Sequence, residues 1–382
     1  MYYLWTMFKD QIIGQETLKG QLLKNIINHQ TPHAQLFVDE NGYGGLPLAL
    51  FQTLLLMYSE TELTAKKQVE SNGFKLLEHP DIHFIYPVVK LGSKKKTYAD
   101  DYVRDWYGFI KANAYGSYGD WYTAINAENK QGIIAVHEID ALHKKIYLKS
   151  YSGGNKVCVI WGIDKMNTEA CNKFLKLLEE PPKNTFFILV ASDITYMLPT
   201  ILSRCQITEI KPIADADLNS YLQSVEWNNV AVPTVEQASG SMRYLVNYKN
   251  SEASQDFEKL FIKCLRTAFQ AQGNKAVVID LMRWVDEISS LGREDQKTFI
   301  LYAIGFLRNA FLLNYPLVGM VHFESRNNFD IKKLAPFVHS RNFMALVALF
   351  EKAFVAVERN VNGKMLFTDL ALQITRQLHK KK

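Results

Sequence analysis

Two apolar runs joined by an amphipathic helix restrict the fold of this chain more than any other feature. KVCVIW at 156–161 and FFILV at 186–190 have the length and composition of strands that are buried on both faces. Between them, four apolar residues share one helical face; Asn167 is the predicted N-cap, and Pro181-Pro182 ends the helix. Strands that alternate with helices predict an α/β fold, with a parallel sheet covered on both sides.

A strand, a glycine-rich loop and a helix occur in that order nearer the N-terminus. An amphipathic helix at about 18–27 precedes the short apolar strand Leu36–Val38. The loop NGYGG at 41–45 follows, and then an apolar helix from about Leu48 to Tyr58. This is the layout of a phosphate-binding P-loop.

The last third of the chain is different, because helical periodicity replaces the strand pattern. Residues 212–250 are predicted to form short helices with a break at Gly240, and helical spacing of apolar residues continues from about 251 to the end. We therefore expect three domains: an α/β domain at 1–211, a small helical domain at 212–250 and an all-α domain at 251–382.

Residues 91–130 are rich in tyrosine and tryptophan and contain three consecutive lysines, Lys94 to Lys96. Basic residues interleaved with aromatic ones can form a surface on which nucleic-acid bases stack. The alternative is an insertion that packs through its aromatic side chains. Four aspartates within the segment favour the packed insertion.

Composition places few further limits on function. Of the 382 residues, 48% are hydrophobic and 22% are charged, which excludes a disordered or collagen-like chain, and the net charge of +5 permits nucleic-acid contact without requiring it. Four cysteines without a CxxC pair argue against a disulfide framework. We expect a soluble, cytoplasmic protein, because the N-terminus does not look like a signal peptide and no membrane span is predicted.

Several motifs closely resemble the clamp-loader branch of the AAA+ superfamily. They are KFLKLLEEPP at 173–182, LPTILSRCQ at 198–206, the opening segment at 8–37, HPDIHFIYP at 79–87 and RNVNGKMLFTDL at 359–370. The resemblance covers nearly the whole chain. It implies an AAA+ P-loop-type parallel-sheet domain with a small helical lid, followed by an all-α collar domain for oligomerisation.

The sequence departs from this family where a nucleotide would bind. On the pattern GxxxxGK[ST], Asp39 takes the first glycine position, whereas Gly42 and Gly44 remain as glycines of the loop. Gly45 takes the position of the lysine that reaches the phosphates, and Leu46 that of the Mg²⁺-binding hydroxyl. The degenerate P-loop therefore predicts that the chain does not bind ATP.

The second nucleotide motif is degenerate as well. An active strand ends in Asp-Glu, and the matching positions here are Trp161 and Gly162. Asp164 lies beyond the strand end, where it is more simply a loop or helix-entry residue. We therefore expect a pseudo-ATPase with no intrinsic catalysis.

The SRC motif, Ser203-Arg204-Cys205, is intact. By the resemblance, Arg204 is an arginine finger that contacts the γ-phosphate of ATP held by a neighbouring subunit, a role that suits the forked, permanently charged guanidinium. The alternative is that Arg204 caps a helix or pairs with a carboxylate.

Other family positions carry no predicted chemistry. Arg243 matches the sensor-2 arginine, but without a nucleotide we expect it to pack or orient the lid, and Ser192 near the sensor-1 position receives no role. Relatives often have a four-cysteine zinc module after the P-loop helix, whereas residues 58–74 here contain no cysteine. No zinc or other metal is expected.

The resemblance thus implies a non-catalytic subunit of the replicative clamp loader of DNA polymerase III. Its expected partners are ATP-binding clamp-loader subunits and a delta-like subunit, with the sliding clamp contacted indirectly and primed DNA contacted non-specifically through the complex. No membrane contact is expected. The alternatives are a degenerate AAA+ adaptor and an independent DNA-dependent ATPase outside the clamp loader.

Overall fold

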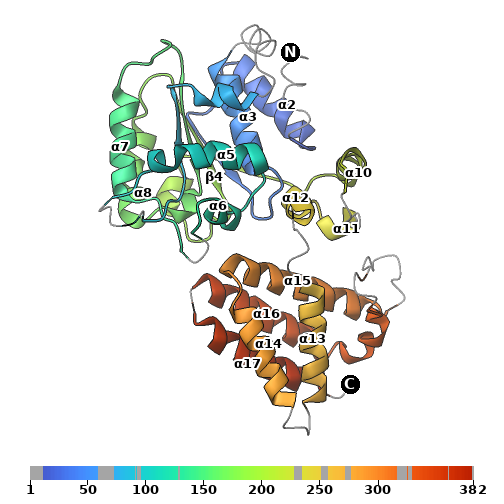
Figure 1. Ribbon diagram of the computed structural model, residues 1–382. Coiled ribbons are helices and arrows are strands. Elements are labelled where there is room, and N and C mark those ends of the chain that lie inside the picture. Colours follow the sequence, from blue (N-terminus) through green and yellow to red (C-terminus); the bar gives the residue numbers. More distant parts are fainter. Residues whose placement is uncertain are drawn as a thin grey trace. The chain divides into compact units, whose positions relative to one another are not determined.

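The computed structural model divides the chain into two compact units, Met1–Asn250 and Ser251–Lys382, which are described separately (Figure 1). The structure describes residues 12–58, 73–90, 92, 96–127, 130–227, 235–250, 257–271, 277–315, 325, 329–359 and 361–380. Several sequence predictions lie outside these residues, including those on the N-terminal segment 1–11, on Lys94 and Lys95, and on most of the segment 58–74.

The first unit contains a five-stranded parallel sheet in the order β2-β3-β4-β1-β5. The strands are β1 (Ala34–Val38), β2 (Ile82–Ile85), β3 (Lys156–Trp161), β4 (Thr185–Ala191) and β5 (Gln206–Glu209). The predicted strands β1, β3 and β4 are confirmed, with ends shifted by no more than two residues. The edge strands β2 and β5 were not predicted. β5 is largely exposed, so its sequence lacks an apolar run.

Both faces of the sheet are buried, and β3 illustrates why. Val157, Val159 and Trp161 join one hydrophobic core, whereas Cys158 and Ile160 join another on the opposite face. Alternation along an extended strand sends successive side chains to opposite sides. The helices α2 (Glu16–Ile27) and α3 (Gly45–Met57) cover the first face, and α7 (Val136–Tyr147) and α8 (Thr168–Glu179) cover the second (Figure 1).

Helix α8 begins and ends where the sequence predicts. The Asn167 side-chain oxygen accepts a hydrogen bond of 2.9 Å from the Ala170 backbone N–H, as an N-cap does. The helix ends at Glu179, two residues before Pro181. The buried face of the helix consists of Ala170, Cys171, Phe174, Leu177 and Leu178. Because these residues extend from the first turn to the last, the helix packs against the sheet along its whole length.

The aromatic segment forms α5 (Val103–Asn113) and α6 (Tyr118–Ala124), preceded by the 3₁₀ turn η2 (Ala99–Tyr102). Trp106 and Trp121 are fully buried, and Trp106 stacks on Tyr86 with ring centroids 4.2 Å apart. The Trp121 indole N–H donates to the Pro87 carbonyl at 2.8 Å. Because these rings fill a core, they are not available to stack on bases, and the packed-insertion interpretation is confirmed for them.

Short helices follow the sheet: α10 (Asp215–Ser224), α11 (Val235–Ala238) and α12 (Met242–Asn250). They share a small core that includes Leu218, Leu245 and Tyr115 of the aromatic segment. Gly240 has a φ of 81°, and a Cβ there would lie 2.4 Å from Pro212 Cβ, which explains the break before α12. These helices belong to the first compact unit, and their separation as a domain at 212–250 stays a prediction.

The second unit is helical throughout its described residues, as predicted. Its helices are α13 (Phe257–Gln270), α14 (Val277–Ser289), α15 (Arg293–Leu312), α16 (Phe343–Glu358) and α17 (Gly363–Leu378), with 3₁₀ turns at Ile331–Lys333 and Ala335–Phe337. Large side chains such as Phe261, Trp284 and Phe350 form a single core. Among the helices that the structure describes, none combines the length and apolar character needed to cross a membrane.

Candidate functional site

Three sequence-predicted positions meet at one edge of the sheet, because they follow the carboxyl ends of neighbouring parallel strands. Asp39 follows β1, Gly162 follows β3 and Ser192 follows β4. The Asp39 N–H donates to Ala191 O at 2.9 Å, and the Gly162 N–H donates to Val190 O at 2.8 Å. Ligands of open α/β sheets bind at this edge, so the state of these residues decides what it can hold.

The Asp39 carboxylate fills the centre of the degenerate P-loop. It accepts hydrogen bonds from the backbone N–H groups of Tyr43 (2.7 Å), Gly44 (3.1 Å) and Gly45 (2.7 Å), and Asp39 is only 5% exposed. These amides precede α3, where an intact loop would use backbone N–H groups to bind phosphate. Their donors already have an anionic partner from the same chain.

The backbone conformation of the loop and its contact with Asp39 both require glycines. Gly42 and Gly44 have φ of 75° and 121°, a range that favours glycine. A Cβ on Gly45 would lie 2.6 Å from Asp39 Cβ, and Leu46 is buried in the core. A lysine at position 45 is therefore incompatible with Asp39 in this position.

The second nucleotide motif is replaced by aromatic packing. Trp161 is buried, and its ring centroid lies 4.8 Å from that of Tyr118 and 5.4 Å from that of Trp106. Gly162 has a φ of 81°, and a Cβ there would lie 2.7 Å from Pro87 Cγ and 3.1 Å from Tyr118 Cε1. Neither position carries a carboxylate that could hold Mg²⁺, and the surroundings of Gly162 leave no room for a side chain.

Asp164 lies in the 3₁₀ turn η3 (Ile163–Lys165), in agreement with its interpretation as a helix-entry residue. Its carboxylate accepts from the Tyr118 hydroxyl at 2.6 Å and from the Ser192 backbone N–H at 3.3 Å, and Lys165 pairs with it at 3.0 Å. Burial, followed by the Asp164 charge, raises the pKa of Tyr118 well above its usual value. The Asp164 carboxylate is thus engaged in contacts within the chain.

Arg243, at the start of α12, contacts the loop directly. Its Nε donates to Tyr115 O at 3.0 Å, its Nη1 to Glu40 O at 3.3 Å, and its backbone N–H to Gly42 O at 3.2 Å. The neighbouring Ser241 hydroxyl donates to Asn41 O at 2.5 Å. These hydrogen bonds hold the start of α12 against the loop.

Tyr115 was not identified from the sequence as part of this site. Its hydroxyl accepts from the Ile13 backbone N–H at 2.8 Å, and its ring approaches Gly44. Burial raises the pKa of the Tyr115 hydroxyl above its usual range. Tyr115 and Tyr118 stand out in the sequence only as members of an aromatic cluster, since their place at the site depends on how the insertion folds back.

Arg204 lies on the surface after the short helix α9 (Pro199–Leu202), with 35% of its side chain exposed. Its Nη2 pairs with Glu179 Oε1 at 2.7 Å, and its Nη1 donates to Thr200 O at 3.0 Å and to Ser203 Oγ at 3.4 Å. Pairing with a carboxylate is the alternative that the sequence left open. An exposed ion pair of this kind contributes little to the free energy of folding.

The remaining cysteine and metal chemistry is limited. Burial raises the pKa of Cys205 to about 11, so its thiol is protonated at neutral pH. Within the part of the chain that the structure describes, no three His, Cys, Asp or Glu side chains are grouped closely enough to hold a metal ion.

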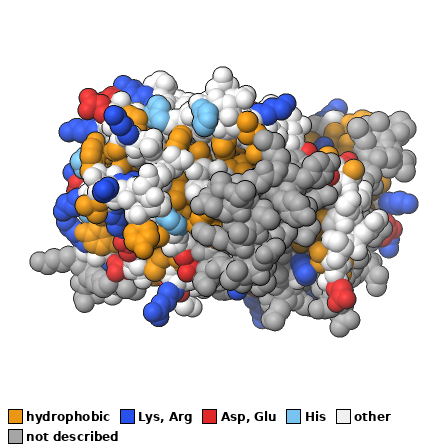
Figure 2. Space-filling model, turned by 90° about the horizontal axis from the view of Figure 1, so that it is seen from above, with side chains coloured by type: hydrophobic (Ala, Val, Ile, Leu, Met, Phe, Trp, Pro, Cys, Tyr) orange, Lys and Arg blue, Asp and Glu red, His pale blue; other side chains and the backbone are white. Residues whose placement is uncertain are grey.

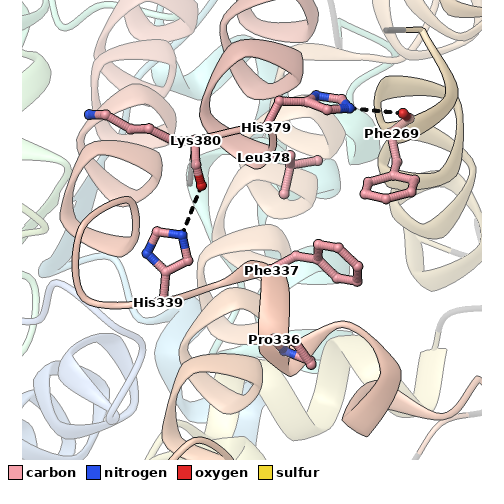
Figure 3. Close-up of a pocket in the computed structure, with 7 residues that line it drawn as sticks. All are labelled: Phe269, Pro336, Phe337, His339, Leu378, His379 and Lys380. Carbon is pink, nitrogen blue, oxygen red and sulfur yellow. Dashed lines mark hydrogen bonds between the residues drawn. The ribbon is translucent and has the colours of Figure 1, made fainter. Parts of the chain in front are cut away.

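The second unit contains a cavity of about 270 Å³ (Figure 3). Its lining residues are Phe269, Pro336, Phe337, His339, Leu378, His379 and Lys380. The two imidazole rings point at backbone carbonyls: His379 Nε2 lies 3.0 Å from Phe269 O, and His339 Nε2 lies 3.0 Å from Lys380 O (Figure 3). These contacts tie helix ends together and leave the rings no evident catalytic task.

On the face shown in Figure 2, Lys and Arg side chains are dispersed among hydrophobic and uncharged ones.

Comparison with known proteins identifies the family. A family model described as DNA polymerase III, delta subunit, matches residues 14–214, which is just over half of the chain. The subunit delta' of DNA polymerase III from Buchnera aphidicola subsp. Acyrthosiphon pisum is 26% identical over 213 residues, covering 54% of this chain and 63% of that protein. The delta' protein of Buchnera aphidicola subsp. Schizaphis graminum is 29% identical over 113 residues, covering 29% of this chain and 34% of the relative.

The matches thus span between one third and two thirds of the length of these first two relatives. Among solved structures, a DNA polymerase III gamma subunit-related protein from Thermotoga maritima covers 95% of this chain, and 99% of that chain is covered in return. Its TM-score is 0.41 at 13% identity, which is too low to establish a shared fold, so the assignment depends on the family match. On that match, the chain belongs to the DNA polymerase III delta subunit family of AAA+ clamp-loader proteins, and the two relatives described above are delta' subunits.

Proposed function

We propose that this chain is a delta-prime-like subunit of the replicative clamp loader of DNA polymerase III, and that it is a pseudo-ATPase. In this role it binds no ATP and has no catalysis of its own. It presents Arg204 to ATP held by a neighbouring subunit while the sliding clamp is loaded onto primed DNA.

One observation carries the pseudo-ATPase proposal: the Asp39 carboxylate accepts three backbone N–H groups of the loop. A phosphate would have to displace this carboxylate and then meet its negative charge. Neither a lysine nor a hydroxyl is present at positions 45 and 46 to compensate. Each lost charge-assisted hydrogen bond forfeits about 1.5–3 kcal/mol, so the residues present do not fit ATP.

The finger proposal is supported by the exposure of Arg204, since 35% of its side chain is accessible on the surface. A trans arginine finger increases the rate of hydrolysis by a factor of about 10³–10⁵. Ser203 and Cys205 form the turn that carries Arg204, through contacts such as the 3.2 Å hydrogen bond from Ser203 Oγ to Thr200 O.

The proposed partners are ATP-binding clamp-loader subunits and a delta-like subunit, in the cytoplasm. The helical second unit would join a collar with the other subunits. Contact with the sliding clamp would be indirect, and contact with primed DNA would be non-specific and made by the whole complex. No zinc is proposed, because the segment 58–74 contains no cysteine.

Two measurements test the proposal. Titration of the isolated protein with Mg²⁺-ATP should give no saturable binding, and tight Mg²⁺-dependent binding would refute the pseudo-ATPase role. In a complex reconstituted with the partner subunits, Arg204→Ala should strongly lower the clamp- and DNA-stimulated ATPase rate while the isolated variant remains folded. An unchanged rate would show that Arg204 is not a finger.

The alternative functions give different outcomes. An independent DNA-dependent ATPase would hydrolyse ATP without partners. A degenerate AAA+ adaptor would co-purify with proteins other than clamp-loader subunits.

A further inference from the structure

Arg204 is paired with a carboxylate that belongs neither to the SRC motif nor to the two degenerate nucleotide motifs. Its guanidinium pairs with Glu179, the last residue of α8, at 2.7 Å. We propose that Glu179 is a positioning residue that orients Arg204 toward the neighbouring subunit's phosphate. This inference rests on the proposed finger function of Arg204.

The contacts of the guanidinium fix its plane. Nη2 pairs with Glu179, while Nη1 donates to Thr200 O at 3.0 Å and to Ser203 Oγ at 3.4 Å. Among the described residues, Nε has no acceptor. The Nε–H thus remains available to a phosphate oxygen while the two terminal nitrogens are held.

Both partners of the ion pair are mounted on firmly held backbone. α8 is capped by Asn167 and buries Leu177 and Leu178 close to Glu179. The turn that carries Arg204 is closed by the Arg204 N–H, which donates to Ile201 O at 3.1 Å, and Ile201 is fully buried. The ion pair therefore joins two rigid elements and limits the rotamers of a long side chain.

The pair is too exposed to contribute much to folding, since Glu179 is 48% and Arg204 35% exposed. The role of the ion pair is to orient the Arg204 guanidinium. An arginine that is free to rotate loses more conformational freedom when it binds phosphate than one already held. The expected loss in rate without Glu179 is about two- to five-fold, the range that corresponds to an exposed ion pair, and far smaller than the loss without Arg204.

The test compares Glu179→Gln with Glu180→Gln in the reconstituted complex. Glu180 is the neighbouring exposed carboxylate and makes no ion pair with a described residue, so it controls for the change in charge. Clamp- and DNA-stimulated ATPase should fall about two- to five-fold in Glu179→Gln through kcat, with KM for ATP unchanged. Glu180→Gln should match the wild type, and thermal unfolding of both isolated variants should be unaltered.

A double variant separates positioning from a general structural effect. If Glu179 acts through Arg204, then Glu179→Gln should cause no further loss in an Arg204→Ala background. An additive loss, a wild-type rate or a faster rate in Glu179→Gln would each overturn the inference. These outcomes differ from failure of the finger itself, in which Arg204→Ala alone would leave the rate unchanged.

Discussion

Replacing Asp39 with alanine removes the anion on which the degenerate loop is built. Three backbone N–H groups at 2.7–3.1 Å lose their acceptor in a site where Asp39 is 5% exposed. Hydrogen bonds to a charged group contribute about 1.5–3 kcal/mol each, and water admitted to the vacated space replaces part of this. Losing the equivalent of two bonds gives a destabilisation of about 3–6 kcal/mol.

That loss is large relative to a typical unfolding free energy of about 5–15 kcal/mol. Urea unfolding followed by circular dichroism should show a clearly lower midpoint for Asp39→Ala. Glu40→Ala is the matched control, because the adjacent Glu40 contacts Arg243 only through its backbone oxygen. A destabilisation below about 1 kcal/mol, or an equal effect in Glu40→Ala, would refute the view that this carboxylate organises the loop.

Two further predictions concern buried positions of the first unit. Burial raises the pKa of Glu138 from 4.5 to about 7, so the folded protein retains a proton that the unfolded chain releases, and stability should fall between pH 4.5 and 7. Glu138→Gln should remove this slope and raise the unfolding free energy at pH 8 by about 2–3 kcal/mol; an unchanged slope in urea titrations at pH 5 and pH 8 would contradict it. Gly162→Ala should destabilise by about 2 kcal/mol or more, because φ is 81° and Cβ would meet Pro87 at 2.7 Å. Gly108→Ala in α5, where a Cβ would meet nothing within 4 Å, should leave the melting temperature equal or higher, and similar melting temperatures for the two variants would count against the steric reasoning.

The comparison of sequence with structure is clearest at the nucleotide edge. The pattern predicted the loop after β1 and the loss of its lysine and hydroxyl, because both follow from local spacing. It predicted a negative charge at Asp39, but not that this charge would turn inward and bind the loop's own amides. From the sequence, a carboxylate at this place is expected only to repel phosphate. The structure shows in addition that three backbone N–H groups of the loop donate to it.

The aromatic segment shows the same limit. Its acidic residues favoured packing over base stacking, and burial of Trp106 and Trp121 confirms this. The sequence did not reveal that Tyr118 would donate to Asp164 at 2.6 Å, a contact between residues 46 positions apart. The edge strand β5 was missed for a related reason, since its pairing with β1 is not accompanied by an apolar pattern in its own sequence.

The sequence by itself determined the alternation of strands and helices, the helical C-terminal part and the absence of the P-loop lysine and hydroxyl. These features depend on local periodicity and on which side chains are present. Only the tertiary structure decided what fills the site instead, namely Asp39 in its own loop, Tyr115 and Tyr118 beside it, and Glu179 beside Arg204. The Asp39 contacts are local but depend on the backbone conformation of the loop, whereas the others join segments far apart in the chain and form only when strand order and helix packing bring those segments together.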